Sequence, residues 1–367
     1  MNYMKLDTPS LLINREIMMT NIKNMQKLAG RNNLSLRPHT KTHKMPYLAK
    51  LQIQEGANGI SVAKTGEAEA MAKSGIDNIF IANQIVGDIK LHRIKKLAPT
   101  IDISFGVDSI EHIEAIERIF QGEDRKAQVL IEIEVGENRS GVIEKDNFIK
   151  IAKYIKSSNN IYLKGIFSHD GHSYGAKDLR ELKEIFISSQ KRTLEFAKLA
   201  RDLDYELEVV SIGSTPSLMH DFPILEGITE IRPGTYILMD TAQGNGVGNY
   251  NRCAATVLST VISKPTEERV IIDVGAKGIT MQTRPKGICA TKGLGYIKNY
   301  DVYIERVFDE HGIINDREFR DKITIGDKVE IIPNHICPVC NLYDKVYLVS
   351  EGEVVDEIQI AGRGKLT

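Results

Sequence analysis

The sequence predicts an α/β protein, built as a (β/α)8 barrel of the TIM type followed by a C-terminal β domain. Short apolar, β-branched runs alternate with helical patterns through the first two-thirds of the 367 residues. Eight such runs precede residue 250, which is the number of strands in this barrel. After about residue 250 the composition changes, and strand-like runs continue almost without helical patterns.

Each expected barrel strand is followed by a helix or a turn. The runs are residues 34–41, 59–64, 78–84, 102–107, 128–135, 163–170, 208–214 and 230–236. Helical segments between them include residues 65–76, which end near Gly75, and residues 178–203, the longest one. A doubly wound sheet is the alternative, but no G-x-G-x-x-G follows the first run, and eight units exceed its usual number.

The last third of the chain predicts a β domain from roughly residue 250 to 367. Its strand-like runs are residues 255–264, 269–275, 327–335, 345–350 and 354–360, separated by Gly, Pro, Asn and Asp.

Composition points to a soluble cytoplasmic enzyme that acts on a small molecule. A net charge of -1 gives no global attraction to nucleic acid or membrane. The opening MNYMKLDTPS lacks the apolar region of a secretory signal, and no run of about 18 apolar residues occurs. Four cysteines in so long a chain do not form a disulfide framework, which fits a reducing compartment.

A basic cluster, RPHTKTHK (37–44), ends the first run. Three interpretations compete: a metal pair formed by His39 and His43, an anion-binding patch, or a lysine nucleophile at Lys41. Because H-x3-H spacing suits a helix face, the metal pair fits a strand end poorly. Residues at the C-terminal ends of barrel strands form the active site, and nearby cations with partial burial lower the pKa of a lysine. This favours Lys41 as the nucleophile.

Two later strand ends predict a phosphate site. Gly213, Ser214 and Thr215 precede Pro216, which offers consecutive backbone N–H groups at a helix N-terminus. RPGTY (232–236) adds further small and hydroxyl-bearing residues after the eighth run. Phosphate sites of these barrels commonly lie after strands seven and eight. A lysine facing a phosphate site suggests pyridoxal phosphate as the cofactor.

The segment PNHICPVCNLYD (333–344) predicts a metal site. His335 and Cys337 stand two residues apart, so in a strand or loop both side chains can point to one side. Imidazole and thiolate together suit Zn²⁺ or a similar divalent ion. No second C-x2-C accompanies Cys337 and Cys340, so a closed four-sulfur site is not expected. The alternative is a half-exposed histidine beside a buried cysteine.

Motifs along nearly the whole chain resemble the D-threonine aldolase and D-serine dehydratase group of fold-type III pyridoxal phosphate enzymes, relatives of alanine racemase. They are DTPSLLI, RPHTKTHK, GISVAKTGEAEAM, GENRSGV, SHDGHSYG, GSTPS, EIRPGTYILMD and PNHICPVCNLYD. The resemblance implies a homodimer with each site near the partner chain. It also implies a barrel of residues 14–249 and a β domain made of residues 1–13 and 250–367.

The resemblance assigns roles to particular residues. Lys41 is expected to hold the cofactor as an imine, and His169 to pack against the pyridine face. Arg139 is expected near the phenolic oxygen, and Arg232 at the ring nitrogen, although a part for Tyr174 stays open. The expected phosphate ligands are Gly213, Ser214, Thr215, Gly234 and Tyr236, and the expected metal ligands are His335 and Cys337.

The expected reaction is retro-aldol cleavage of a D-3-hydroxy amino acid to glycine and an aldehyde, in which a base removes the hydroxyl proton. His43 or His169 is the candidate base. Pro-x-x-Asn-Leu after the metal motif resembles the aldolases, whereas His-x-Cys resembles D-serine dehydratase, which gives a 2-oxo acid and ammonia. Cysteine favours zinc over manganese or magnesium. A racemase and a pyridoxal phosphate-binding protein without turnover are weaker alternatives.

Overall fold

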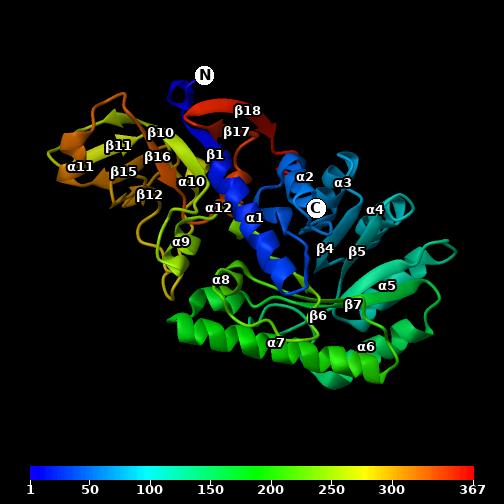
Figure 1. Ribbon diagram of the computed structural model, residues 1–367. Coiled ribbons are helices and arrows are strands. Elements are labelled where there is room, and N and C mark those ends of the chain that lie inside the picture. Colours follow the sequence, from blue (N-terminus) through cyan, green and yellow to red (C-terminus); the bar gives the residue numbers. More distant parts are fainter.

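The structure is a computed structural model that describes residues 1–367, and it consists of two sheets with helices around one of them (Figure 1). The first sheet has eight parallel strands in the order β2-β9-β8-β7-β6-β5-β4-β3. Their bounds are β2 (Ser35–Leu36), β3 (Ile60–Val62), β4 (Asn78–Gln84), β5 (Asp102–Val107), β6 (Ala127–Ile133), β7 (Ile161–Ser168), β8 (Val209–Ile212) and β9 (Glu230–Ile231).

The ring of strands is completed where β2 and the segment that follows it meet β3 and the residues just before it. His39 and Ser61 form a parallel bridge, and Ser61 donates its N–H to the carbonyl of Pro38 at 2.8 Å. A second bond joins the N–H of Asn58 to the carbonyl of Leu36 at 2.8 Å. The predicted eight parallel strands are therefore confirmed.

Two strands are much shorter than predicted because prolines interrupt them. The run 34–41 contributes only Ser35–Leu36, and the run 230–236 only Glu230–Ile231. Pro38 and Pro233 have no N–H to donate to a strand ladder. The chain beyond each proline forms a 3-10 turn instead, η2 (Thr40–Thr42) and η4 (Thr235–Ile237). Lys41 thus lies on a tight turn and not on the strand itself.

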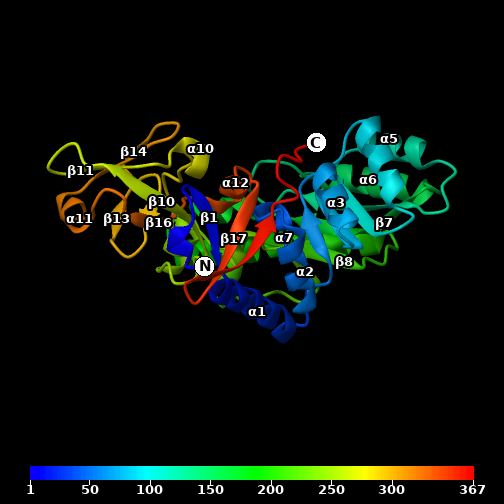
Figure 2. The same cartoon turned by 90° about the horizontal axis from the view of Figure 1, so that it is seen from above.

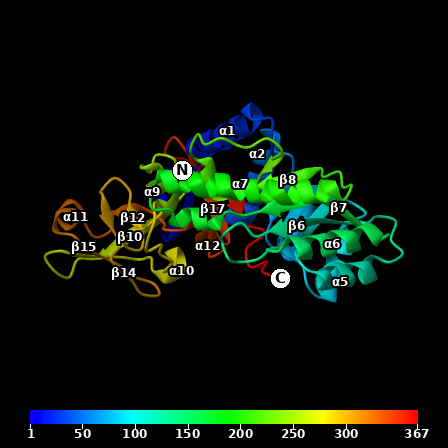
Figure 3. The same ribbon diagram turned by 90° about the horizontal axis from the view of Figure 1, so that it is seen from below.

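Helices surround the barrel strands. They are α1 (Arg15–Arg31), α2 (Pro46–Gln54), α3 (Thr65–Lys73), α4 (Asp88–Leu97), α5 (Ile110–Phe120), α6 (Lys145–Ser157), α7 (Leu179–Asp202) and α8 (Thr215–Leu218). Helix α9 (Thr241–Val247) lies instead beside the second sheet (Figure 1), where the N–H of Thr241 donates to the carbonyl of Pro333 at 3.0 Å. In α7, buried Leu182, Phe186 and Phe196 recur at helical spacing and form the face that covers the sheet. Figure 3 shows α7 running beneath the barrel.

The second sheet has ten strands and includes the N-terminal segment. Strand β1 (Ser10–Asn14) pairs antiparallel with β10 (Ala255–Ser263) and parallel with β17 (Lys345–Ser350). The remaining strands are β11 (Arg269–Ile272), β12 (Tyr296–Ile297), β13 (Val302–Tyr303), β14 (Arg306–Val307), β15 (Gly312–Asn315), β16 (Lys328–Ile332) and β18 (Glu353–Gln359). Short helices α10 (Ala276–Ile279), α11 (Arg317–Lys322) and α12 (Ile336–Cys340) connect them.

The two parts share a hydrophobic core. One cluster of 78 buried apolar side chains includes Phe105 of the barrel and Ile331 of the second sheet, so a continuous core holds the two parts together. Figure 2 shows α12 and β17 between the barrel and the rest of the second sheet. Helix α12 contacts η2, which brings the metal motif to the turn that carries Lys41. None of the helices combines the length and the apolar character needed to cross a membrane.

Candidate active site

A cavity of about 720 Å³ opens at the C-terminal ends of the barrel strands, between the barrel and α12. It brings together eleven of the residues predicted from sequence. These are Lys41, Arg139, His169, Tyr174, Gly213, Ser214, Thr215, Arg232, Gly234, His335 and Cys337. Residues far apart in the sequence thus meet at the barrel mouth.

Lys41 has an environment that favours the unprotonated amine. Burial lowers the pKa of Lys41 below its ordinary value, and the positive charge of Arg139 acts in the same direction. Cys337 and Glu137 oppose this shift but do not cancel it. An amine with a lowered pKa is a better nucleophile at neutral pH.

His43 and Tyr236, which were expected at the active site, do not line the cavity. His43 is fully buried; its Nδ1 accepts from the N–H of Met45 at 3.0 Å, and its Nε2 lies 3.2 Å from Oε1 of Gln52. Gln52 also donates Nε2–H to the hydroxyl of Tyr236 at 2.8 Å. The side chains of His43 and Tyr236 are therefore both hydrogen-bonded to Gln52 in a buried network outside the cavity.

Two other histidines do line the cavity. Burial holds the pKa values of His39 and His169 well below the ordinary range, and Lys41 lowers both further. Nδ1 of His169 lies 2.7 Å from the carbonyl oxygen of Gly213. Since a carbonyl only accepts, Nδ1 carries the proton and Nε2 is free to accept one. His39 lines the cavity, whereas His43 contacts Gln52 outside it, so the two do not form a metal pair.

The loop before α8 has the features of an anion site. Gly213 has φ +142°, and a Cβ there would lie 3.0 Å from the backbone nitrogen of Arg232. Ser214 precedes the first residue of α8, and its hydroxyl is bonded to Ser173 at 2.9 Å. Oγ1 of Thr215 is buried and has no hydrogen-bond partner. A buried hydroxyl without a partner is costly unless a ligand satisfies it.

Arg232 is fixed at the bottom of the cavity. Its guanidinium donates Nη2–H to the carbonyl of Ser168 at 2.7 Å and also hydrogen-bonds Ser211 through Nη1. The guanidinium carbon lies 5.2 Å from the ring centroid of Phe167. Burial lowers the pKa of Arg232 to about 10, so it stays charged at neutral pH.

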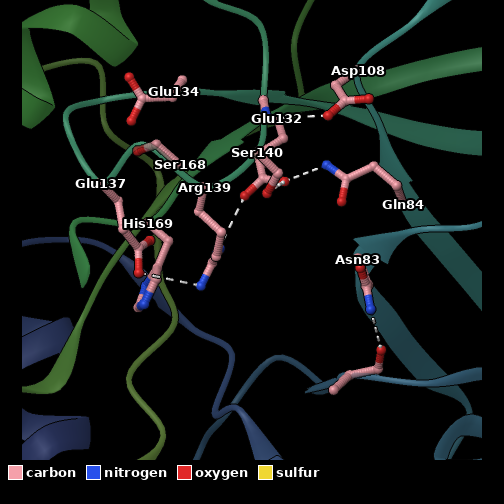
Figure 4. A network of polar contacts seen from close by, with 12 residues as sticks. Asn83, Gln84, Asp108, Glu132, Glu134, Glu137, Arg139, Ser140, Ser168 and His169 are labelled. Atoms are coloured by element: carbon pink, nitrogen blue, oxygen red, sulfur yellow. Dashed lines mark hydrogen bonds and ion pairs between the residues drawn. The ribbon is translucent and has the colours of Figure 1, made fainter. Parts of the chain in front are cut away.

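Arg139 lies near a polar network that sequence reasoning missed (Figure 4). Its guanidinium nitrogens lie 3.5 Å from Glu132 and 3.4 Å from Glu137, and its side chain is 49% exposed. Glu132 is buried, accepts from the hydroxyl of Ser140 at 3.0 Å and is bonded to Gln84. The signal in the sequence was a glutamate inside the apolar run of β6.

His335 and Cys337 face each other at the start of α12, whereas a strand or loop was expected. His335 is the N-cap, and Cys337 lies in the first turn of α12. Burial raises the pKa of Cys337, but His335 and a hydrogen bond with Thr42 (3.3 Å) outweigh it and lower the pKa to about 7. Burial lowers the pKa of His335, yet the thiolate raises it overall.

Several neighbours of this pair were not predicted. Nδ1 of His335 lies 3.0 Å from Oε1 of Gln282, and the N–H of Ile336 donates to Asp240 at 3.1 Å. The structure contains no group of three or more His, Cys, Asp or Glu residues placed to hold a metal ion. His335 and Cys337 therefore offer two protein ligands.

Comparison with known proteins gives matches over nearly the whole chain. The family described as alanine racemase, N-terminal domain, matches residues 13–242, and a putative serine dehydratase domain matches residues 254–349. D-threonine aldolase from Arthrobacter sp. is 30% identical over 365 residues, covering 98% of this chain and 93% of that protein. 3-Hydroxy-D-aspartate aldolase from Paracoccus denitrificans (strain Pd 1222) is 27% identical over 380 residues, covering 100% and 94%.

A solved structure also matches this chain over nearly its whole length. The D-threo-3-hydroxyaspartate dehydratase from Delftia sp. HT23 superposes with a TM-score of 0.90 at 25% identity, covering 97% of this chain and 98% of that one. Aldolases and dehydratases thus share this architecture.

Proposed function

Because the chain belongs to the alanine racemase-like family that includes D-threonine aldolase and D-serine dehydratase, as its motifs predicted, we propose that it cleaves D-3-hydroxy amino acids to glycine and an aldehyde, with pyridoxal phosphate and a divalent metal ion. One observation carries the proposal. Lys41, the unpartnered hydroxyl of Thr215 and the His335–Cys337 pair all line a single cavity.

The residues present fit pyridoxal phosphate. Thr215 has a buried hydroxyl without a partner, and Gly213, Ser214 and Thr215 line the same cavity. Lys41 has the lowered pKa that bonding to an aldehyde requires. Arg232, held by Ser168, would face the ring nitrogen. The cavity of about 720 Å³ is in the usual range for small-molecule sites.

The pair of His335 and Cys337 fits a divalent metal ion in part. An imidazole and a thiol with a pKa near 7 supply one nitrogen and one sulfur ligand, a set that favours zinc. The pair would hold the ion through two protein ligands, and water and substrate oxygen would supply the rest.

Pyridoxal phosphate and the metal ion would supply part of the chemistry, and the side chains of the cavity supply the rest. When bound, pyridoxal phosphate supplies an electron sink for charge that develops at Cα, and the metal ion supplies a Lewis acid at the 3-hydroxyl. His169, neutral and with Nε2 free, accepts the hydroxyl proton, which starts cleavage of the Cα–Cβ bond. Its bond to Gly213 holds the imidazole in the required tautomer. His169 is preferred to His43 as the base because His43 does not line the cavity and contacts Gln52 instead.

Dehydration is the second candidate. The His-x-Cys spacing of His335 and Cys337 resembles D-serine dehydratase, and a dehydratase has the same overall structure. In that reaction the amine of Lys41 removes the proton from Cα, and the 3-hydroxyl leaves. The product is then a 2-oxo acid with ammonia.

Product analysis separates the two reactions. The purified protein, supplied with pyridoxal phosphate and zinc or manganese, is incubated with D-threonine and with D-serine. The proposal predicts glycine and an aldehyde from D-threonine. A 2-oxo acid with ammonia would show a dehydratase, and the absence of any product from both substrates would contradict a lyase on these two compounds.

A further inference from the structure

Two threonine hydroxyls converge on the sulfur of Cys337. Oγ1 of Thr42 lies 3.3 Å from Sγ, and Oγ1 of Thr235 lies 3.6 Å from it. Neither hydroxyl has another hydrogen-bond partner in the structure. Thr42 is fully buried, and Thr235 is nearly so. The sulfur is therefore the group that both hydroxyls are placed to bind.

Each threonine belongs to a turn that also carries a residue of the expected cofactor site. Thr42 follows Lys41 in η2, and Thr235 follows Gly234 at the start of η4. Cys337 comes from α12, far along the chain. The two hydrogen bonds thus join the metal motif to both turns at the barrel mouth.

The Thr42 hydroxyl is held in place from several sides. The N–H of Lys44 donates to the carbonyl of Thr40 at 2.7 Å, which closes the turn around Thr42. Gly234 packs against the hydroxyl, and a Cβ there would lie 3.0 Å from Oγ1 of Thr42. Nζ of Lys44 also donates to Oδ1 of Asn341 at 2.9 Å, which ties the turn to the end of α12. The hydroxyl therefore has a fixed place beside α12.

A metal ion changes the hydrogen bonds that the sulfur can make. As a thiol, Cys337 has one proton, which it can donate to the hydroxyl of Thr42. As a metal ligand it is a thiolate, which has no proton and only accepts. A threonine hydroxyl can rotate to donate instead of accept. Two hydroxyls without other partners match the thiolate, because both can donate to it at once.

The alternative is that the two threonines only fill space. Valine has the same shape and carries no hydroxyl that must be removed from water on folding. Buried hydroxyls are therefore expected where they have a polar partner, and at both positions that partner is the sulfur.

We propose that Thr42 and Thr235 are positioning residues of the metal site, whose hydroxyls donate to Sγ of Cys337 and direct it toward the ion. The proposal rests on the proposed function and names the residues that support its sulfur ligand. Thr42, at the shorter distance, contributes more than Thr235.

The zinc affinity of the full chain tests this role without any turnover. The protein is freed of metal and titrated with zinc in competition with a chromophoric chelator. Thr42→Val keeps the shape and removes the hydroxyl, so it should bind zinc at least about tenfold more weakly, as is typical for loss of an outer-shell partner. Thr235→Val should weaken binding by a smaller factor, and Thr42→Ser should restore most of the affinity.

Thr65→Val is the matched control. Thr65 is buried like Thr42, but its hydroxyl has no hydrogen-bond partner and it does not line the cavity. This variant should bind zinc as tightly as the unaltered protein does.

Cobalt(II) gives a second readout, which a role in packing alone would not change. The bond of this ion to a thiolate produces a charge-transfer band in the near ultraviolet, and a hydrogen bond to the sulfur raises the energy of that band. The band should therefore move to longer wavelength in Thr42→Val and return to its original place in Thr42→Ser. Should Thr42→Val fail to fold, the same measurements on Thr235→Val decide.

Three results would overturn the proposal. The first is equal zinc affinity and an equal cobalt band in the unaltered protein and both valine variants. The second is a loss of affinity that Thr42→Ser does not restore. The third is failure of the unaltered protein to bind zinc, a result that does not depend on the folding of any variant.

The outcome is separable from that of the proposed function. If zinc binding depends on Thr42 but D-3-hydroxy amino acids are not cleaved, the lyase proposal fails and the role of the threonines stands. If cleavage occurs and zinc affinity does not depend on either threonine, the positioning role fails alone.

Discussion

Nδ1 of His335 lies 3.0 Å from Oε1 of Gln282, across the interface between α12 and the loop after α10. Because the amide oxygen only accepts, Nδ1 carries the proton and Nε2 is left to face Cys337 or a metal ion. A partner of this kind fixes the tautomer and the ring orientation of a metal ligand.

Gln282→Ala should therefore lower metal affinity by roughly 10- to 100-fold, as is typical for loss of an outer-shell partner. Gln282→Glu keeps the acceptor and should retain most of the affinity. Competition with a chromophoric chelator measures both. Unchanged zinc affinity in Gln282→Ala would show that His335 needs no such support.

Thr215→Val should lower pyridoxal phosphate affinity by about tenfold, since one hydrogen bond to a charged group contributes about 1.5 kcal/mol or more. Thr215→Ser, which keeps the hydroxyl, is the control. Without cofactor the valine variant should unfold at the same temperature or higher, because the buried hydroxyl has no partner to lose. A large loss of stability in the cofactor-free variant would contradict this role for Thr215.

The barrel could be predicted from sequence because its strands are buried on both faces and read as apolar runs, as in β5 and β6. The turns could not, because η2 and η4 depend on Pro38 and Pro233 and on contacts made only in the folded chain. The sequence placed His43 beside Lys41, whereas in the structure Lys41 lines the cavity and His43 contacts Gln52 and Met45 outside it.

The positions of Gln282 and Arg284 could not be predicted from the sequence for a related reason. They lie some fifty residues before the metal motif, in a loop with no periodic pattern. The contact of Gln282 with His335 and the place of Arg284 in the cavity wall arise only in the folded chain. Polar residues at strand ends of the barrel, by contrast, have a position that the fold class itself dictates.

His43 should make the stability of the protein depend on pH. Burial lowers its pKa from 6.5 to about 4 in the folded state, so between these values the unfolded state binds more protons. The contribution is fully present above pH 6.5 and is lost as the pH falls toward 4, by up to about 3 kcal/mol.

Unfolding by urea at several pH values measures this effect. His43→Asn, which can still accept from Met45, should reduce the slope of the profile between pH 4 and 6.5. Part of the slope should remain, because burial also lowers the pKa values of His39 and His169. His92→Asn, at an exposed position of α4, should leave it as it is. Identical profiles for the unaltered protein and His43→Asn would contradict the buried neutral state of His43.

Glu230→Gln should destabilise the barrel strongly. Oε2 of Glu230 forms a buried ion pair with Nε of Arg37 at 2.7 Å, and Oε1 accepts from Ser211 at 2.6 Å. Removing one charge leaves Arg37 unpaired inside the barrel, which costs roughly 3–5 kcal/mol. Asp88→Asn, which breaks a surface pair with Arg118, is the control and should leave the urea midpoint unchanged. A similar midpoint for both variants would refute the importance of the buried pair.

Identification of the lysine that bonds pyridoxal phosphate tests the central claim most directly. The protein is loaded with the cofactor, reduced with borohydride, digested and mapped by mass spectrometry. The cavity geometry predicts a pyridoxyl group on Lys41 and none on Lys44 or Lys64, and Lys41→Ala should lose both the label and the visible absorbance that Lys64→Ala retains. A label on Lys64, or a protein that takes up no cofactor, would contradict the account.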